Sequence, residues 1–224
     1  MHTVIFDIDG TLLDSVDVHA KAWQEALRHF GHDVSFLDVR RQIGKGGDKL
    51  LPVFLNGKEL AKFGKQLEEY RAKIFKRDYL HLIKPFPCVR ELFQCLLSNG
   101  ARIGLASSAK AEEVEYYKKL AGIDDLIHAE TSFDDVEESK PAPDIFAAAL
   151  ERLGNPNPRE AIAVGDTPYD AQAAGKIGLR IVGVLCGGFP ENDLRAAGCI
   201  AIYKDPCDLL AHYAESPLAE QTAA

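Results

Sequence analysis

Hydrophobic residues in the first part of the chain recur mostly at every third or fourth position, which is the spacing of amphipathic helices. This pattern follows a short apolar strand that begins at Thr3. It predicts helices at about 16–30, 37–43, 48–55 and 59–79. In the last of these, cationic side chains, Arg71 among them, lie between the apolar positions. We expect these cations to form a solvated face.

From Pro85 onward, short apolar runs rich in β-branched residues alternate with helical stretches. Strands are expected at 102–106, 127–129, 161–165, 180–185 and 200–203. This alternation is typical of a parallel sheet with crossover helices. We therefore predict an α/β fold with a core of residues 1–14 and 85–214, an all-helical insertion of residues 15–84, and a frayed polar tail at 215–224.

The composition is that of a globular protein, with 46% hydrophobic and 27% charged residues among 224. The formal net charge of −8 opposes nonspecific attraction to nucleic acids and anionic membranes, because lysine and arginine are the main phosphate-binding side chains. We expect neither partner. Any phosphate that the protein binds must meet local positive charge.

The cysteines form an odd set without a Cys-x-x-Cys pair, which favours reduced thiols over a disulfide framework or a zinc ribbon. They are Cys88, Cys95, Cys186, Cys199 and Cys207. The first strand begins too early to leave room for a signal peptide, and no apolar run reaches the roughly 18 residues of a membrane-spanning helix. These features predict a cytoplasmic protein.

Four segments place polar side chains at strand ends or in the turn before a helix. These side chains are Asp7 and Asp9, Ser107 and Ser108, Lys140, and Asp166 and Asp170. Ligands of open α/β sheets bind at the carboxyl ends of the strands. Hydroxyls and free N–H groups at the start of a helix also suit a phosphate. Taken singly, however, each segment is also explained by an Asx turn, a helix cap or a surface position.

Together, the four segments resemble the motifs of the haloacid dehalogenase superfamily. The matching residues are Asp7-x-Asp9-Gly10-Thr11, Ser107, Lys140-Pro141 and Gly165-Asp166-x-x-x-Asp170. The resemblance runs from Val4 to Leu185 and implies a Rossmann-like parallel sheet. It also implies that the helical insertion corresponds to the small cap of the phosphatase-like members.

The resemblance further implies the chemistry of the site. Asp7 would attack phosphorus and form an aspartyl phosphate. Asp9 would protonate the leaving oxygen and then activate water, so we expect its surroundings to raise its pKa. Ser107, with Ser108 beside it, and Lys140 would hold the phosphoryl oxygens.

If the fold brings the four aspartates together, each close pair repels by about 4 kcal/mol at 4 Å and a dielectric constant near 20. Such a cluster needs a cation, and oxygen ligands without histidine or thiolate select Mg²⁺. The resemblance implies three metal ligands, which are Asp7, the backbone carbonyl of Asp9, and Asp166. Asp170 is either a further ligand or a residue that orients the others.

The resemblance favours a phosphatase, with two alternatives. The stretch that contains His19 is similar to β-phosphoglucomutase, so His19 would assist Asp9 or simply occupy a cap helix near the hinge. Against a mutase, the cap loop offers Gly44-Lys45-Gly46-Gly47-Asp48 in place of the mutase arginine, and Asp166 follows a glycine instead of an acid. A dehalogenase would lack Asp9. The second alternative is a catalytically idle phospho-ligand-binding module.

The glycine-rich loop is the candidate closing edge of the cap, with Lys45, Gly46 and Gly47 near the substrate. An ordinary turn between helices explains the same residues. We therefore expect a magnesium-dependent phosphatase of a small phosphorylated metabolite, such as a sugar phosphate or phosphoglycolate. The expected oligomeric state is a monomer or a dimer.

Overall fold

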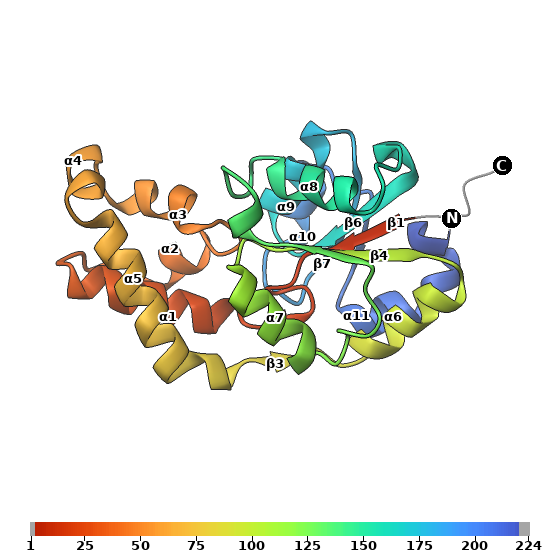
Figure 1. Cartoon of the computed structure of the whole chain (residues 1–224), viewed down its shortest axis with the longest axis horizontal. Helices are drawn as coiled ribbons and strands as arrows, with labels where there is room; N and C mark the ends of the chain where they lie inside the picture. The colour runs from red at the N-terminus through yellow and green to blue at the C-terminus, as the bar shows by residue number, and fades with distance from the viewer. Residues whose placement is uncertain (1–2, 220–224) are drawn as a thin grey trace.

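The computed structural model describes residues 3–219, and its core is a six-stranded sheet in which neighbouring strands run parallel (Figure 1). The strand order is β5-β4-β1-β6-β7-β8. These strands are β1 (Thr3–Phe6), β4 (Arg102–Ala106), β5 (Ala129–Thr131), β6 (Ala161–Gly165), β7 (Arg180–Val184) and β8 (Ala201–Tyr203). The predicted α/β fold is confirmed, and β1 lies near the middle of the sheet.

Helices cover both faces of this sheet. Because side chains alternate along a strand, Val4 and Phe6 point to one face and Ile5 to the other. The first face packs against α6 (Val89–Ser98), α7 (Ala111–Leu120) and α11 (Pro206–Ala211). The second packs against α8 (Asp144–Arg152), α9 (Pro168–Lys176) and α10 (Glu191–Ala197). Short 3-10 turns are η4 (Phe133–Asp135), η5 (Pro158–Glu160), η6 (Tyr213–Glu215) and η7 (Pro217–Ala219).

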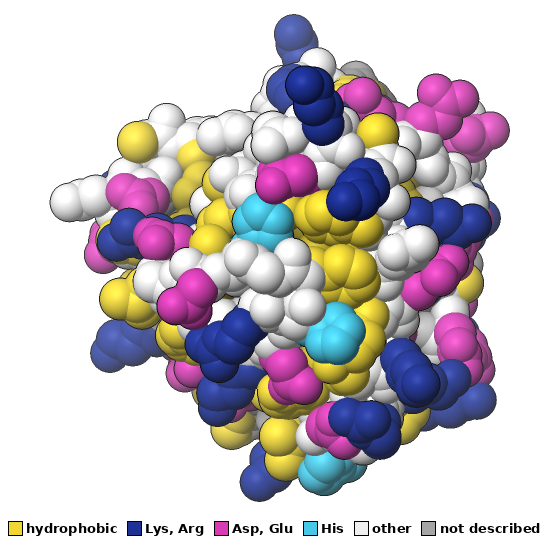
Figure 2. All heavy atoms as spheres, turned by 90° about the vertical axis from the view of Figure 1, so that its left-hand side faces the viewer, with side chains coloured by type: hydrophobic (Ala, Val, Ile, Leu, Met, Phe, Trp, Pro, Cys, Tyr) yellow, Lys and Arg dark blue, Asp and Glu magenta, His cyan; other side chains and the backbone are white. Residues whose placement is uncertain are grey.

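The remaining helices gather at one end of the molecule, beside the sheet (Figure 1). They are α1 (Val16–His29), α2 (Phe36–Arg40), α3 (Gly47–Phe54), α4 (Gly57–Glu59) and α5 (Lys65–Ile74). They share a hydrophobic cluster of their own, which includes Leu27, Leu50 and Leu67. Figure 2 views this end and shows hydrophobic side chains at its surface among charged ones. We call this helical end the cap.

The chain enters and leaves the cap through two short strands that pair with each other. β2 (Leu13–Asp14) and β3 (Lys84–Pro85) are antiparallel, with Leu13 opposite Pro85. The sequence analysis did not predict this pair. It brings both ends of the helical segment to one place beside β1.

Two predicted elements differ in detail. The helix expected at 59–79 contains π-helical turns on both sides of α5, η1 (Leu60–Gly64) and η2 (Phe75–Tyr79), and then the 3-10 turn η3 (Leu80–Leu82). The strand expected at 127–129 begins at Ala129, where its ladder with Gly104 starts.

The prediction of a frayed tail from Glu215 is wrong as far as residue 219. Leu218 is fully buried in the core against the first face, and Ser216 donates a hydrogen bond to the Tyr213 carbonyl at 2.7 Å. The buried Leu218 and the Ser216 hydrogen bond therefore hold residues 215–219 against the core. Residues 220–224 of the predicted tail lie outside the described residues.

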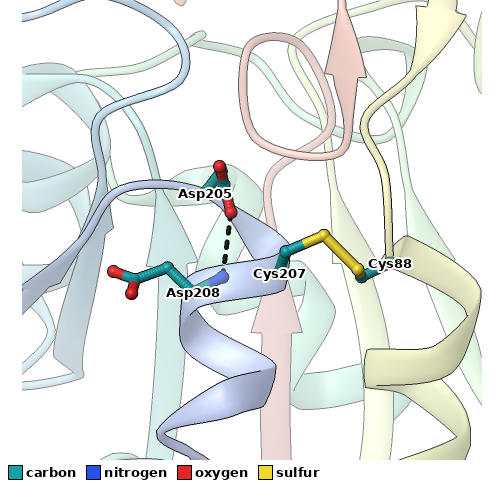
Figure 3. The surroundings of a disulfide bond; sticks show 4 residues. All are labelled: Cys88, Asp205, Cys207 and Asp208. Carbon is teal, nitrogen blue, oxygen red and sulfur yellow. Dashed lines mark hydrogen bonds between the residues drawn. A yellow bond between two sulfur atoms is a disulfide. The ribbon is translucent and has the colours of Figure 1, made fainter.

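The prediction that all cysteines are reduced is also wrong. Cys88, at the start of α6, and Cys207, in α11, form a disulfide, as Figure 3 shows. The two helices lie side by side and bring the Cα atoms to 5.0 Å, although 119 positions separate the residues in sequence. Cys95, Cys186 and Cys199 are free, as expected. None of the helices within residues 3–219 is long and apolar enough to cross a membrane.

Candidate active site

The carboxyl end of β1 forms the floor of the site. Asp7 directly follows the strand, is 5% exposed, and is anchored by its N–H to the Val164 carbonyl of β6 at 2.9 Å. The Thr11 hydroxyl lies 3.2 Å from Asp7 Oδ2 and 3.1 Å from Asp166 Oδ1, so it can donate to either carboxylate. The turn at Gly10, with a φ of +82°, places Thr11 there.

Lys140 brings a positive charge beneath these carboxylates. Its ammonium is fully buried, forms an ion pair with Asp7, and donates to the Ala106 carbonyl at 2.9 Å. Its Nζ also lies 2.7 Å from Asp170 Oδ1, an ion pair without hydrogen-bond geometry. Burial lowers the pKa of Lys140, but Asp170 and Asp7 outweigh it and raise the pKa. The alternative of a surface lysine is therefore wrong.

Three aspartates form a compact acidic cluster. Oxygen atoms of Asp7, Asp166 and Asp170 all lie within 4.8 Å of one another. Burial raises the pKa of Asp7 to about 7, since Lys140 only partly offsets it and Asp170 adds repulsion. Burial and the charges of Asp7 and Asp170 also raise the pKa of Asp166 well above its usual value. The single lysine thus leaves negative charge uncompensated.

Asp166 offers an unpaired oxygen to a cation. Its Oδ2 is buried and has no hydrogen-bond partner within residues 3–219. A Cβ atom at Gly10 or Gly187 would lie 2.4 or 1.6 Å from this oxygen, so glycine at both positions keeps the space clear. Asp170 Oδ2 instead accepts from the Thr167 hydroxyl at 2.6 Å, in a capping box at the start of α9. One Asp170 oxygen therefore has the structural role of an acid in the first turn of a helix. Asp166 is not the N-cap, because Thr167 occupies that position.

Asp9 points away from this cluster and toward the cap. Its Oδ1 accepts from the Ser15 hydroxyl at 2.6 Å and lies 2.9 Å from His19 Nε2. Arg71 contacts the other ring nitrogen, and because a guanidinium can only donate, we place the His19 proton on Nε2. His19 therefore donates to Asp9.

These contacts overturn one expectation. Burial raises the pKa of Asp9, but the electrostatic interaction and hydrogen bond of His19, the hydrogen bond of Ser15 and the charge of Arg71 lower it, and the net shift is downward. The raised pKa expected for Asp9 is therefore not found in this arrangement.

The two serines after β4 have different roles. Ser107 is fully buried, and its Oγ accepts from the Ala109 N–H at 3.1 Å, which leaves its hydroxyl proton available. Ser108 donates to the Gly44 carbonyl of the cap at 3.3 Å. Neither caps a helix, because α7 begins only at Ala111.

The glycine-rich loop of the cap closes over the core. The Gly46 N–H donates to Ser139 Oγ at 2.9 Å, and a Cβ at Gly44 would lie 2.8 Å from the Thr167 side chain. Gly47 begins α3. The Lys45 ammonium donates to Gln42 Oε1 at 2.6 Å and lies 4.4 Å from the centre of the Tyr169 ring. The loop therefore contacts the core mainly through its backbone.

A cavity of about 110 Å³ lies between this loop and the strand ends. Asp7 and Asp9 line its inner part together with Ser108, and Lys45, Gly46 and Gly47 line its edge. Further lining residues are Trp23, Glu68, Arg71, Lys110 and Glu113.

Arg71 is the main residue that the sequence analysis placed wrongly. Its side chain is only 12% exposed, pairs with Glu113 at 3.6 Å, and lies 4.4 Å from the centre of the Phe75 ring. Its Nε is buried without a hydrogen-bond partner in the described chain. The helical pattern placed it among surface cations, and only packing against α7 turns it inward. Ser15 and Glu68 were also missed.

The chain has clear relatives. A family model described as haloacid dehalogenase-like hydrolase matches residues 4–184. The chain is 28% identical to a phosphorylated carbohydrates phosphatase of Thermotoga maritima over 91% of this chain and 94% of that protein. It is 33% identical to a phosphoglycolate phosphatase of Aquifex aeolicus over 84% and 86% of the two chains. The crystal structure of a hydrolase from Pseudomonas syringae superposes with a TM-score of 0.86 at 31% identity, over 96% of this chain and 99% of that one.

Proposed function

Because the chain belongs to the haloacid dehalogenase-like hydrolase family, we propose that it is a magnesium-dependent phosphatase that acts on a small phosphorylated metabolite. The observation that carries this proposal is the buried cluster of Asp7, Asp166 and Asp170 beside Lys140. The names of the relatives suggest sugar phosphates and phosphoglycolate as candidate substrates.

The acidic cluster fits a divalent cation of oxygen-only coordination, for which Mg²⁺ is the usual choice. Asp7 and Asp166 would hold the metal, because their oxygens lie close together and Asp166 Oδ2 is unpaired. Asp9 would contribute its backbone carbonyl only, since its carboxylate faces His19. Asp170 Oδ1 forms an ion pair with Lys140 and Oδ2 accepts from Thr167, so Asp170 would either bind the metal through Oδ1 or orient Lys140. The bound ion would neutralise the phosphoryl oxygens.

The reaction would proceed in two steps on this chain's own residues. Asp7 attacks phosphorus, the ester bond breaks, and Asp9 gives a proton to the leaving oxygen. Asp9 then takes a proton from water as the water attacks the aspartyl phosphate, which regenerates Asp7 and releases phosphate. Ser107, through its free hydroxyl proton, and Lys140 hold the phosphoryl oxygens, and Ser108 lies beside them at the cavity wall. Because His19, Ser15 and Arg71 lower the pKa of Asp9 in this arrangement, we expect the charge of bound substrate to raise it for the first step.

A phosphomutase stays the second candidate, because His19 contacts Asp9 as the similarity to β-phosphoglucomutase implies. The loop at Gly44–Asp48 without an arginine favours the phosphatase. A phosphatase releases inorganic phosphate, whereas a mutase returns the phosphoryl group to the sugar. Measuring both products from a sugar phosphate separates the two.

The decisive test is release of phosphate from p-nitrophenyl phosphate, with Mg²⁺ and with chelator. Asp7→Asn should abolish turnover in a folded protein, because an amide is not a nucleophile toward phosphorus. Asp33→Asn, which changes a carboxylate whose side chain is 89% exposed, is the matched control. Full activity of Asp7→Asn would overturn the proposal, and phosphate-ester binding without turnover would favour the binding-module alternative.

The other predictions extend this proposal. A cytoplasmic location and a monomeric or dimeric state stay predictions, as does the expectation that nucleic acids and membranes are not partners.

A further inference from the structure

The outer half of the active-site cavity is formed by the cap and α7. It faces the leaving group of the substrate. Here we consider its side chains Trp23, Glu68, Arg71, Lys110 and Glu113. The proposed function leaves these residues without a role. Their charges and unused hydrogen-bonding atoms restrict the chemistry of the leaving group.

Charge in this outer half is balanced. Arg71 and Lys110 carry two positive charges, and Glu68 and Glu113 two negative ones. Lys45 adds little, because its ammonium is engaged by Gln42 and the Tyr169 ring at the rim. A second anionic group on the substrate would therefore gain no net attraction from the outer wall.

The same wall offers an unused donor and an unused acceptor. Arg71 Nε is buried without a partner, and the Glu68 carboxylate forms no hydrogen bond or ion pair within residues 3–219. Glu68 is held close to the loop, since a Cβ at Gly47 would lie 2.2 Å from its Oε1. A hydroxyl can donate to a carboxylate and accept from a guanidinium, whereas a carboxylate or phosphate group can only accept.

The volume of the cavity limits the size of the leaving group. The cavity of about 110 Å³ is smaller than the roughly 300 Å³ at which sites for drug-sized ligands begin. A phosphoryl group must occupy the inner part. The outer part then has room for a short chain, with Trp23 beside its carbon atoms.

From this geometry we infer that the substrate is the monophosphate of a short, uncharged polyol or sugar, and that Glu68 selects it by accepting from a hydroxyl and repelling a second anion. This inference rests on the proposed phosphatase activity. It ranks sugar and polyol phosphates above phosphoglycolate and other substrates whose leaving group is charged.

A matched pair of substrates tests the inference directly. Glycerol 3-phosphate and 3-phosphoglycerate share a three-carbon phosphate ester, but one ends in a hydroxymethyl group and the other in a carboxylate. We expect kcat/KM to favour glycerol 3-phosphate by about tenfold or more, because a hydroxyl can donate to Glu68 whereas a carboxylate is repelled by it. Phosphoglycolate and pyrophosphate should be poor substrates for the same reason.

A matched pair of variants assigns the preference to Glu68. Glu68→Gln removes the charge and keeps an amide of the same shape, so the ratio of the two kcat/KM values should fall about fivefold or more. Glu69→Gln, the next residue on α5, changes a carboxylate whose side chain is 67% exposed and should leave the ratio unchanged.

The outcomes separate this inference from the proposed function. Activity on p-nitrophenyl phosphate together with a preference for 3-phosphoglycerate, phosphoglycolate or pyrophosphate would overturn the inference alone. An unchanged ratio in Glu68→Gln would overturn the assignment to Glu68. Absence of Asp7-dependent phosphate release from every ester would overturn the proposed function, and the inference with it.

Discussion

At the scale of single residues, Asp166 shows how tightly the site is built. Thr11 lies within hydrogen-bonding distance of one of its oxygens, and Gly10 and Gly187 border the other. The glycines matter here because any side chain would fill the space next to the unpaired oxygen. Both positions therefore affect the metal site without providing a ligand.

Gly187→Ala should reduce activity strongly. The added Cβ would lie 1.6 Å from Asp166 Oδ2, so either the loop or the carboxylate must move. Such overpacking costs about 1–3 kcal/mol of stability, and we expect a fall in kcat/KM of about tenfold or more from displacement of Asp166. Steady-state kinetics and thermal unfolding measure the two effects. Gly175→Ala is the control, since nothing lies within 4 Å of its Cβ position; equal kinetics in both variants would contradict the argument.

Removal of the metal should expose the repulsion in the acidic cluster. Mg²⁺ at about 100 times its Kd should raise the Tm of the wild-type protein by roughly 5–10 °C. Asp166→Asn should abolish this rise and should itself raise the Tm in chelator, because it removes a buried carboxylate whose pKa is raised by burial and like charges. Calorimetry with and without Mg²⁺ checks both. A wild-type Mg²⁺ response in Asp166→Asn would exclude Asp166 as a ligand.

Sequence patterns predict residues well when a motif fixes them locally and poorly when packing does. Asp7, Lys140 and Asp166 follow from short segments whose order in the chain is informative, and the structure brings them together. Arg71 and Cys88 depend on which helices lie side by side, which no local spacing encodes. Their expected exposed and reduced states were wrong for that reason.

At the scale of elements, the positions of the core strands were more predictable than the helical cap. Each core strand is an apolar run bounded by turns, so its position is clear within about two residues. The expected long helix fails because η1 and η2 insert π-turns on both sides of α5. Hydrophobic spacing does not distinguish a π-turn from a continuous helix.

Hydrogen bonds at the rim are among the contacts that join the cap to the core. The Tyr169 hydroxyl of α9 donates to the Arg41 carbonyl at 2.6 Å, and Arg40 donates to the Gly187 carbonyl at 3.0 Å. These bonds lie at the outer side of the glycine-rich loop. They therefore stabilise the closed arrangement in which the cavity is formed.

Tyr169→Phe should weaken closure and leave the chemistry intact. It removes one hydrogen bond, worth about 0.5–1.5 kcal/mol, and keeps the ring against Phe189. We expect KM to rise by about two- to tenfold with little change in kcat. Tyr116→Phe on α7 is the control, because its hydroxyl forms no hydrogen bond within the described chain. A fall in kcat without a change in KM would show that Tyr169 acts otherwise.

At the scale of the whole molecule, the Cys88–Cys207 disulfide ties α6 to the last helix of the core, with Asp205 capping that helix by accepting from the Asp208 N–H at 2.9 Å (Figure 3). Disulfides are rare in the cytosol of most organisms, with hyperthermophiles as an exception. Outside hyperthermophiles, the disulfide therefore argues against the predicted cytoplasmic location.

Cys207→Ser should lower the stability of the oxidised protein by about 2–4 kcal/mol, since the bond closes a long loop, and neither cysteine lines the active-site cavity. Denaturant unfolding measures this loss, and kcat/KM should stay within about twofold of wild type. Cys95→Ser, which changes a half-buried free thiol, is the control. A wild-type unfolding midpoint for Cys207→Ser would mean that the bond contributes nothing.

The antiparallel pair of β2 and β3 has an evolutionary consequence. The two junctions of the cap, Leu13 and Pro85, are paired directly opposite each other. A replacement segment of any length can therefore be joined to the core at the same two positions. Selection can therefore exchange or remodel the region that chooses the molecule to be cleaved and leave Asp7, Lys140 and Asp166 in the core untouched. Grafting another cap between these anchors is the corresponding route for an engineer.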